Sequence, residues 1–441
     1  MAAQIKVYMH PTLKRKILSR KAKIAVVGLG YVGLPLAVAF ARKGFSVFGI
    51  DANVQRVERI KSLKSYIADV SNAAIAQVMR NGKFRATCDL SLLKDADAIL
   101  ICVPTPLKRR YTPDISFIQS AIKNVARYLK KGTLVVLEST TYPGTTEELI
   151  KPVLEKTGLR AGKDFYLAFS PERIDPGNKH FQVTGIPKVI GGLTARCAEL
   201  TRELYGQINP KIHTVSSPKA AEMTKLLENS FRIVNIGWLT EVAQMCHKLG
   251  IDVWEVIAAA KTKPFGFMAF YPGLGVGGHC IPEDPLYLYW KARRYGFNSK
   301  FIRLAADINT HMPLYCLHRL EELFKARGKN IENTKVLVVG VTYKKDVKDL
   351  RKSPALKFIE LLLHRGTRVD YHDPLVSYVK LGGLDIKSVA LDAKHIKGYD
   401  AVVIAVDHSK VNYHVVRANA RLIFDLKNVY GDKTDKNIFK L

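Results

Sequence analysis

Cys280 is the residue of this 441-residue sequence whose surroundings are most typical of covalent chemistry. It follows a glycine-rich loop in the stretch FYPGLGVGGHCIPEDPLYL, and Asp284 comes four residues after it. Glycines lack a Cβ, so they leave the loop free to bring the thiol beside a bulky ligand. A thiol needs a neighbouring base or cation to react near neutral pH, and Asp284 or a lysine could provide it. A cysteine that only fills the core is the alternative.

Lys225 and Asn229 are two further polar residues whose spacing suits a site. They are four residues apart in SPKAAEMTKLLENSFRIVNIGWLTEVAQMCHKLG, whose pattern predicts a helix, so both lie on one helix face. A lysine there can stabilise an oxyanion or hold a water, and the asparagine can donate to the same oxygen. A solvent-exposed pair is the alternative.

The same stretch predicts an unusually long helix. Ser217 is a plausible N-cap, Pro218 suits the first helical position, and Gly250 suits the end. A helix of this length, about 48 Å at 1.5 Å per residue, suits a link between two domains and an interface between subunits.

The stretch IAVVGLGYVGLPLAVAFA has no charged residue, so it first suggests a membrane-spanning helix. Its glycines, however, are spaced as GxGxxG between a predicted strand and a predicted helix, and a second strand, SVFGI, ends at Asp51. This order is the dinucleotide-binding fingerprint. Gly28 allows the sharp turn, Gly30 the close approach of a pyrophosphate, and Gly33 the close packing of the helix. The Asp51 carboxylate can bind a ribose diol and would repel a 2′-phosphate, which predicts NAD rather than NADP.

Strand-like and helical runs alternate along the chain, which predicts an α/β fold. The loops of VPTPL and ESTTYPGTT, and the residues Glu172 and Arg173, each follow a predicted strand, where ligands of open α/β sheets bind. A second such unit begins near Thr334 with KVLVVGVTYKKD. Its turn has lysines, Lys344 and Lys345, in place of the dinucleotide glycines, which suits a mononucleotide or diphosphate.

We therefore predict two Rossmann-like doubly wound domains joined by a long central helix and a helical dimerisation domain. The predicted boundaries are 1–214 for the NAD-binding domain, 215–330 for the central domain with the cysteine loop, and 331–441 for the C-terminal domain. Subunit contacts through the long helix predict a homodimer or a higher homo-oligomer.

The formal net charge of +30 exceeds what one anionic substrate and one anionic cofactor require. A basic protein that binds nucleic acid or a lipid surface is therefore one alternative. The lysines and arginines are spread along the chain without a groove-reading motif, so we expect no nucleic-acid partner. The six cysteines are scattered without pairs, and the basic start has no signal-peptide pattern, so we expect reduced thiols, a cytoplasmic location and no metal.

Seven motifs together resemble the UDP-sugar 6-dehydrogenase family. They are GLGYVGLPLA, VPTPL, ESTTYPGTT, FSPERIDPGN, KLLEN, KPFGFMAFYPGLGVGGHCIPEDPLYL and YKKDVKDLRKSP. The resemblance runs from about Ala22 into the C-terminal domain. SPERIDPGN and KPFGF are similar to the branch of UDP-N-acetylglucosamine 6-dehydrogenases, whereas UDP-glucose and UDP-N-acetylmannosamine remain alternative substrates.

The family oxidises the C6 alcohol of the sugar to a carboxylate with two NAD⁺, and the resemblance implies a role for each matching residue. Cys280 matches the nucleophile, with Lys225, Asn229, Asp284, Glu172 and Thr140 as further catalytic groups. The implied cofactor contacts are Gly28, Gly30, Tyr31, Val32, Gly33, Asp51, Arg56, Thr105, Thr140 and Arg351. The implied substrate contacts are Glu172, Arg173, Lys225, Asn229, Phe270, Tyr271, Gly275, Gly277 and Lys344.

Four positions depart from the family pattern. Leu274 replaces a common proline, Glu283 an apolar or basic residue, and Lys348 and Lys352 common acids. None of these changes removes a catalytic group. A two-electron β-hydroxyacid-type dehydrogenase, which shares the glycine turn and the long helix but needs no thiol, remains an alternative.

Overall fold

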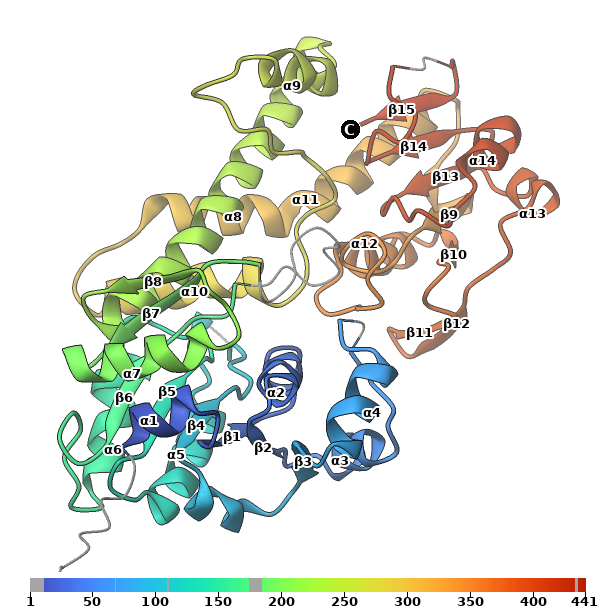
Figure 1. The fold of residues 1–441 in the computed structure, drawn as a ribbon. Coiled ribbons are helices and arrows are strands. Elements are labelled where there is room, and N and C mark those ends of the chain that lie inside the picture. Colours follow the sequence, from blue (N-terminus) through green and yellow to red (C-terminus); the bar gives the residue numbers. More distant parts are fainter. Residues whose placement is uncertain (1–11, 68, 109–110, 174–184, 433–434) are drawn as a thin grey trace, which may run out of the picture. The chain divides into compact units, whose positions relative to one another are not determined.

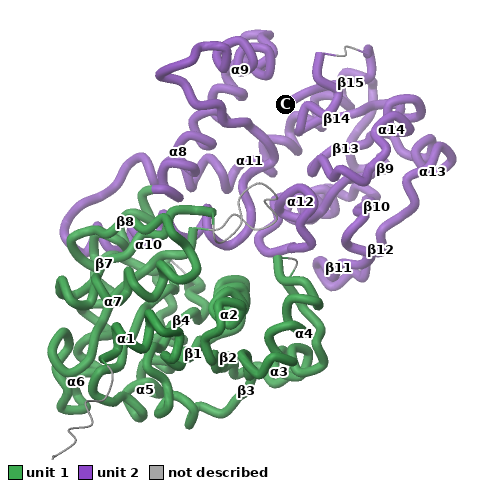
Figure 2. Tube along the Cα trace, in the orientation of Figure 1, with its two compact units in different colours: residues 1–227 green, residues 228–441 purple. Residues whose placement is uncertain are grey.

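The computed structural model describes residues 12–67, 69–108, 111–173, 185–432 and 435–441. The chain divides into two compact units, 1–227 and 228–441, with the boundary inside helix α8 (Pro218–Leu249) (Figure 2). Each unit has an α/β fold with its own parallel or mainly parallel sheet, which confirms the predicted fold class. The three-domain boundaries stay a prediction.

The sheet of the first unit has the strand order β3-β2-β1-β4-β5-β6-β7-β8. Its strands are β1 (Lys23–Val27), β2 (Ser46–Ile50), β3 (Phe84–Thr87), β4 (Ala98–Ile101), β5 (Leu134–Leu137), β6 (Tyr166–Phe169), β7 (Lys188–Gly192) and β8 (Ile212–Val215). Only the β6–β7 pair of this sheet is antiparallel. The first six strands have the order 3-2-1-4-5-6 of dinucleotide-binding folds.

Helices cover both faces of this sheet (Figure 1). The core around Ile24 and Val26 includes side chains of α2, α4 and α7, whereas that around Ala25 and Val27 includes side chains of α5 and α6. This two-sided burial explains why β1 is an uninterrupted apolar run. The helices of the unit before α8 are α1 (Leu13–Leu18), α2 (Gly33–Arg42), α3 (Val54–Lys61), α4 (Asn72–Arg80), α5 (Ser116–Tyr128), α6 (Lys151–Glu155) and α7 (Ala195–Gly206), with shorter helices at Leu90–Asp95 and Thr146–Ile150.

Helix α8 has the limits that its capping residues predict. The Ser217 Oγ accepts a hydrogen bond from the Ala220 N–H (3.2 Å), and Pro218 is the first helical residue. Gly250 follows the last residue with φ +71°, a conformation that ends helices and that glycine adopts easily.

Among the described residues, α8 and the other helices all lack a segment long and apolar enough to cross a membrane.

The second unit contains α9 (Val253–Lys261), α10 (Cys280–Arg293) and α11 (Lys300–Lys325), followed by a parallel sheet of order β10-β9-β13-β14-β15. Helices α11 and α12 contribute to the core on one face, and α13 and α14 to the core on the other. This is the flavodoxin-like order 2-1-3-4-5, whose ligand crevice lies where the winding reverses, here between β9 and β13. The elements are β9 (Lys335–Val339), α12 (Pro354–His364), β10 (Arg368–His372), the hairpin β11 (Tyr378–Leu381) and β12 (Leu384–Lys387), α13 (Ala393–Lys397), β13 (Ala401–Ile404), α14 (Tyr413–Asn419), β14 (Ile423–Asp425) and β15 (Ile438–Lys440), with a short helix at Ile331–Asn333.

Candidate functional site

The turn between β1 and α2 has the geometry that its glycine spacing predicts. Gly28 has φ +93°, and a Cβ at this position would lie 2.5 Å from the Cys102 carbonyl oxygen. A Cβ at Gly33 would lie 1.8 Å from the Gly28 carbonyl oxygen, so α2 packs closely against the turn. At Gly30 the space of a Cβ is open, with no heavy atom within 4 Å. The turn therefore fits a pyrophosphate at Gly30, before the N-terminus of α2.

Asp51 follows β2 and is only 7% exposed. Its carboxylate accepts hydrogen bonds from the backbone N–H groups of Leu29 and Asn53, both at 2.8 Å, and the Arg56 Nη1 lies 3.4 Å away. Asp51 therefore holds the glycine turn in shape as well as placing an acidic group where the fingerprint requires one. Of the other predicted cofactor residues in this turn, Tyr31 is exposed and Val32 is half-buried.

Thr105 and Thr140 lie in the loops that follow two neighbouring parallel strands, β4 and β5. Thr105 is buried, and Thr140 is half-buried. The Ser139 hydroxyl donates a hydrogen bond of 2.7 Å to the Val103 carbonyl, which joins the two loops. The structure thus places both threonines at the carboxyl edge of the sheet that also carries the glycine turn.

Glu172 lies just past β6 and contacts both the predicted Arg173 and Lys188, which the sequence analysis did not single out. Its Oε1 accepts the Arg173 backbone N–H (2.6 Å), and its Oε2 is 3.4 Å from the Lys188 Nζ. Lys188 also donates to Glu138 (2.7 Å), whose other oxygen accepts the Tyr205 hydroxyl. Burial raises the pKa of Glu138 to about 7, although Lys188 acts in the opposite direction. Lys188 thus joins the predicted catalytic Glu172 to a buried carboxyl.

Arg173 donates from its Nη1 to the Pro187 carbonyl (2.6 Å). The remainder of the motif SPERIDPGN, from Ile174 onward, lies outside the described residues.

Glu222, in the first turns of α8, is another buried carboxyl of the first unit. It accepts hydrogen bonds from the Gly144 N–H and from the Thr146 N–H and hydroxyl. Burial raises the pKa of Glu222 to about 7, although these hydrogen bonds favour the charged form. The folded protein therefore binds a proton more tightly at Glu222 than the unfolded chain does.

We expect the free energy of unfolding to fall as pH rises from 5 to 8, and Glu222→Gln to weaken this dependence. Because a raised carboxyl pKa stabilises the folded state only where the group is protonated, the wild type should lose about 2 to 3 kcal/mol relative to the variant over this range. Urea unfolding of both proteins at pH 5 and pH 8 measures the difference. Parallel pH profiles would show that Glu222 is already ionised at pH 5.

Cys280 is an exposed cysteine and the first residue of α10, with His279 as the N-cap. The free N–H groups of the first helical turn and the helix dipole stabilise negative charge at this position. The core-filling alternative therefore does not hold for Cys280, whereas Cys102, Cys197 and Cys316 are buried.

Two of the glycines before Cys280, Gly277 and Gly278, permit close packing against another loop of the second unit. A Cβ at Gly277 would lie 2.5 Å from the Lys352 carbonyl oxygen, and the Gly278 N–H donates to the Arg351 carbonyl (2.9 Å). On the other side, Asn309 of α11 accepts from the Val276 N–H (2.6 Å) and donates to the Val276 carbonyl (3.1 Å). The sequence analysis missed this asparagine.

Asn229 and Asp284 form a buried pair in the second unit. The Asn229 Nδ2 donates to the Asp284 Oδ2 at 2.5 Å, and the two residues are 5% and 2% exposed. Lys225, one turn earlier on α8, is also buried. These exposures exclude the alternative of a solvent-exposed Lys225–Asn229 pair. Asp284 is one helical turn after Cys280, so the thiol and the carboxylate that accepts the Asn229 hydrogen bond both lie in the N-terminal turns of α10.

Two of the departures from the family pattern are partners in the structure. The Glu283 carboxylate forms an ion pair with Lys352, and its other oxygen is 3.2 Å from the His279 Nε2. The family pattern has an apolar or basic residue at 283 and an acid at 352, whereas here an acid at 283 pairs with a base at 352. Burial lowers the pKa of His279; Arg351 and Lys352 act in the same direction, and Glu283 opposes them. Glu283 is thus next to Asp284 in the sequence, but its charged partners in the structure are His279 and Lys352.

The aromatic residues of the loop before Cys280 pack on nearby helices. Phe270 has an edge-to-face contact with Phe231 (ring centroids 5.7 Å apart), and Tyr271 stacks on Trp254 (6.1 Å). Tyr271 nevertheless remains exposed, so one face of this loop is accessible to a ligand.

Three basic residues of the second unit surround its glycine-rich loop and the loop after β9. Lys344 is half-buried after β9, and the Arg351 guanidinium binds the Asp349 carboxylate through Nε (2.9 Å) and Nη2 (2.7 Å). Lys427, after β14, was missed by the sequence analysis, which had no motif to mark it. Its Nζ would lie 3.7 Å from a Cβ at Gly273. Burial lowers the pKa of Lys427, and Asp407 and Asp425 oppose this effect.

Comparison with known proteins gives matches along nearly the whole chain. The NAD binding domain of the UDP-glucose/GDP-mannose dehydrogenase family matches residues 22–209, the central domain residues 219–311, and the UDP binding domain residues 337–432. The UDP-N-acetyl-D-glucosamine 6-dehydrogenase of Pseudomonas aeruginosa is 37% identical over 433 residues, covering 94% of this chain and 98% of the relative.

Archaeal relatives are equally similar. The UDP-N-acetyl-D-mannosamine dehydrogenase of Pyrococcus horikoshii is 35% identical over 424 residues, covering 95% of this chain and 98% of the relative. The solved structure of a UDP-D-ManNAc dehydrogenase from the same organism superposes with a TM-score of 0.86, with 95% and 98% coverage of the two chains. The matched domains, the glycine turn and the cysteine loop agree: this chain belongs to the UDP-glucose/GDP-mannose dehydrogenase family and is an NAD-dependent UDP-sugar dehydrogenase.

Proposed function

We propose that the protein oxidises the C6 hydroxyl of UDP-N-acetyl-D-glucosamine to a carboxylate in two successive two-electron steps. The observation that carries this proposal is the exposed thiol of Cys280 at the start of α10, one turn from the buried Asn229–Asp284 pair. UDP-N-acetyl-D-mannosamine is the second candidate substrate, because relatives of similar identity act on one or the other sugar according to their names.

The residues divide the chemistry between them. The glycine turn and Asp51 would hold NAD⁺, which would supply the hydride acceptor for each of the two oxidations, two NAD⁺ per sugar. Cys280 adds as thiolate to the C6 aldehyde and holds it as a thiohemiacetal, and loss of the second hydride leaves a thioester. Water then attacks this thioester, which releases the carboxylate and returns the thiol. A covalent intermediate keeps the reactive aldehyde bound while the cofactor is exchanged.

The buried polar groups serve the oxygen and proton transfers of this sequence. We assign Lys225 and Asn229 to the oxyanion that develops at C6, since ammonium and amide N–H groups stabilise such charge. Asp284, hydrogen-bonded to Asn229, directs the water, and Glu172 and Thr140 assist proton transfer. Lys344, Arg173, Phe270, Tyr271, Gly275 and Gly277 contact the substrate. Arg56, Thr105 and Arg351 contact the cofactor.

A panel of UDP-sugars, followed at the NADH absorbance, tests the proposal. UDP-N-acetylglucosamine should give the highest kcat/KM, and NADH formed per sugar consumed should be two. A preference for UDP-N-acetylmannosamine or UDP-glucose would change the substrate but keep the chemistry. A ratio of one would overturn the thioester route in favour of a simple two-electron dehydrogenase.

We also propose that the enzyme is a homodimer assembled through α8. Phe231, Trp238 and Met245 are exposed at seven-residue intervals on this helix, and Leu249 extends the stripe to its end. Residues seven apart lie on one side of a helix, so these side chains form a continuous apolar stripe. Exposed apolar patches of this kind mark protein interfaces, and a second copy of α8 offers a complementary surface.

Trp238→Lys is expected to convert the dimer to a monomer, because two charges would then be buried at the symmetric interface. Light scattering during size-exclusion chromatography measures the mass. Arg232→Glu, an exposed change about 100° around the same helix from Phe231, is the matched control and should leave the dimer intact. A monomeric wild type, or a dimeric Trp238→Lys, would rule out this interface.

A further inference from the structure

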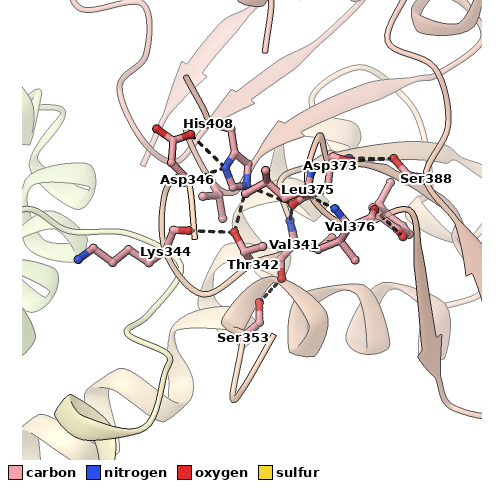
Figure 3. Close-up of polar contacts among 12 residues, drawn as sticks. Val341, Thr342, Lys344, Asp346, Ser353, Asp373, Leu375, Val376, Ser388 and His408 are labelled. Carbon is pink, nitrogen blue, oxygen red and sulfur yellow. Dashed lines mark hydrogen bonds and ion pairs between the residues drawn. The ribbon is translucent and has the colours of Figure 1, made fainter. Parts of the chain in front are cut away.

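His408 is a fully buried histidine in the loop between β13 and α14 of the second unit. It lies where three adjacent strands end: Asp373 directly follows β10, Thr342 follows β9, and His408 follows β13 (Figure 3). The His408 Nε2 is 3.1 Å from the Asp373 Oδ2 and 3.0 Å from the Thr342 Oγ1. On the other side of the ring, the backbone N–H of Asp346 donates to Nδ1 at 3.0 Å.

These partners require one form of the ring. Since Nδ1 accepts the Asp346 N–H, it has no proton, and the proton of the neutral imidazole is on Nε2, facing the Asp373 carboxylate. Asp373 also accepts the N–H groups of Val341, Leu375 and Val376. Burial opposes ionisation of Asp373, but the hydrogen bonds from His408 and the backbone prevail and lower its pKa. A fixed carboxylate thus orients the ring.

The ring and its neighbours hold the backbone of the β9–α12 loop. Thr342, whose Oγ1 contacts His408, donates its hydroxyl proton to the Lys344 carbonyl (2.9 Å). Asp346 has φ +57°, an unfavourable conformation for a residue with a side chain, and the bond from its N–H to His408 helps to maintain it. Ser409, next to His408, donates its N–H and its hydroxyl to the Asp346 carboxylate at 2.9 and 2.6 Å.

The consequence for the site follows from topology. The loops after β9 and β13 flank the point where the sheet reverses its winding, which is the ligand position of such sheets. His408 joins these two loops, and Lys344 is fixed at its carbonyl while its side chain extends away from the cluster (Figure 3). A lysine has four rotatable bonds, so a fixed backbone lowers the entropy lost when it binds a ligand.

We infer that His408 is a positioning residue for substrate binding, which fixes the β9–α12 loop through Asp346 and Thr342 so that Lys344 meets the diphosphate of the nucleotide sugar. This inference rests on the proposed role of Lys344. It assigns no chemical step to His408, which is buried and contacts only protein groups among the hydrogen bonds described.

Three substitutions test the inference through binding of UDP, measured by titration calorimetry, with NAD binding and the thermal midpoint recorded alongside. His408→Phe keeps a ring but removes the polar contacts of both ring nitrogens, and UDP affinity should fall about tenfold or more while NAD affinity stays within about twofold. His408→Asn places an amide oxygen near the position of Nδ1, so it should retain most of the affinity. Thr342→Val loses the hydrogen bond to the Lys344 carbonyl with little change of side-chain shape, and it should weaken UDP binding to a similar extent. This variant also tests the inference if His408→Phe does not fold.

Val402→Ala opens a cavity in the core to which α13 and α14 contribute, and Val402 has no side-chain hydrogen bond to the β9–α12 loop. It therefore controls for stability alone and should leave UDP affinity unchanged. Lys344→Ala separates the inference from the proposed function. If Lys344→Ala weakens UDP but His408→Phe and Thr342→Val do not, the inference is wrong and the role of Lys344 stands. If Lys344→Ala leaves UDP affinity unchanged, the proposed role of Lys344 is wrong, and the inference that rests on it is overturned as well. Equal weakening by Val402→Ala would also overturn the inference, because it would reduce the effect to lost stability.

Discussion

Cys280→Ala should lower turnover by about a thousandfold or more while NAD affinity stays within about twofold of the wild type. The reason is that alanine removes the sulfur that holds the aldehyde and forms the thioester, whereas the glycine turn and Asp51 belong to the other unit. NADH production measures turnover, and calorimetry measures cofactor binding. A full rate without the thiol would contradict the covalent route.

Cys88 provides the matched control for this prediction. It is the other cysteine that is exposed, and it follows β3 at a position with no proposed role. Cys88→Ala should therefore turn over at the wild-type rate, and a thiol-alkylating reagent should inactivate it as it inactivates the wild type. Alkylation should not change the low residual rate of Cys280→Ala, because the reactive thiol is absent.

Asp284→Asn should lower kcat by about a hundredfold or more and change KM by less than about threefold. Asparagine is nearly isosteric with aspartate, and its amide oxygen can accept the bond that the Asn229 Nδ2 now makes at 2.5 Å. The substitution therefore removes the buried negative charge without opening a cavity. Steady-state rates at saturating NAD measure the effect, with the thermal midpoint as a check on folding.

Asp307→Asn is the control for a lost carboxylate. Asp307 lies on α11 with an exposed side chain, 3.6 Å from the Arg303 Nε, where an ion pair contributes little. Its substitution should leave both kcat and KM unchanged. If Asp284→Asn behaved in the same way, Asp284 would have only a structural role, and another group would have to direct the water.

Local motifs in the sequence were sufficient to predict the elements that carry the site. The GxGxxG turn, the apolar strand before it and Asp51 after the second strand predicted the dinucleotide loop, because the positive φ of Gly28 and the close approach of Gly33 to the Gly28 carbonyl lie within the motif itself. The limits of α8 were also predicted, because capping is a local property of Ser217, Pro218 and Gly250. The exposed position of Cys280 agrees with the expectation that it is not core filling.

Residues that act through distant partners could not be predicted in this way. Lys188 contacts Glu138 and Glu172 across 50 and 16 residues of sequence, and neither the spacing nor the residue types mark them as a group. Glu283 and Lys352 appeared to be separate departures from the family pattern until the fold brought their charges together. The close packing at Gly277 could not be predicted either, since it depends on Lys352 and Tyr343, which are distant in the sequence.

The sequence by itself determined the strands around the glycine turn, the limits of α8, the turn itself and the residue types available for the chemistry, because each depends mainly on a few neighbouring residues. Only the tertiary structure decided which buried charges are paired, and that His408, Asp373 and Thr342 meet at three strand ends. Such contacts depend on strand order, and strand order follows from how the whole chain buries its apolar faces.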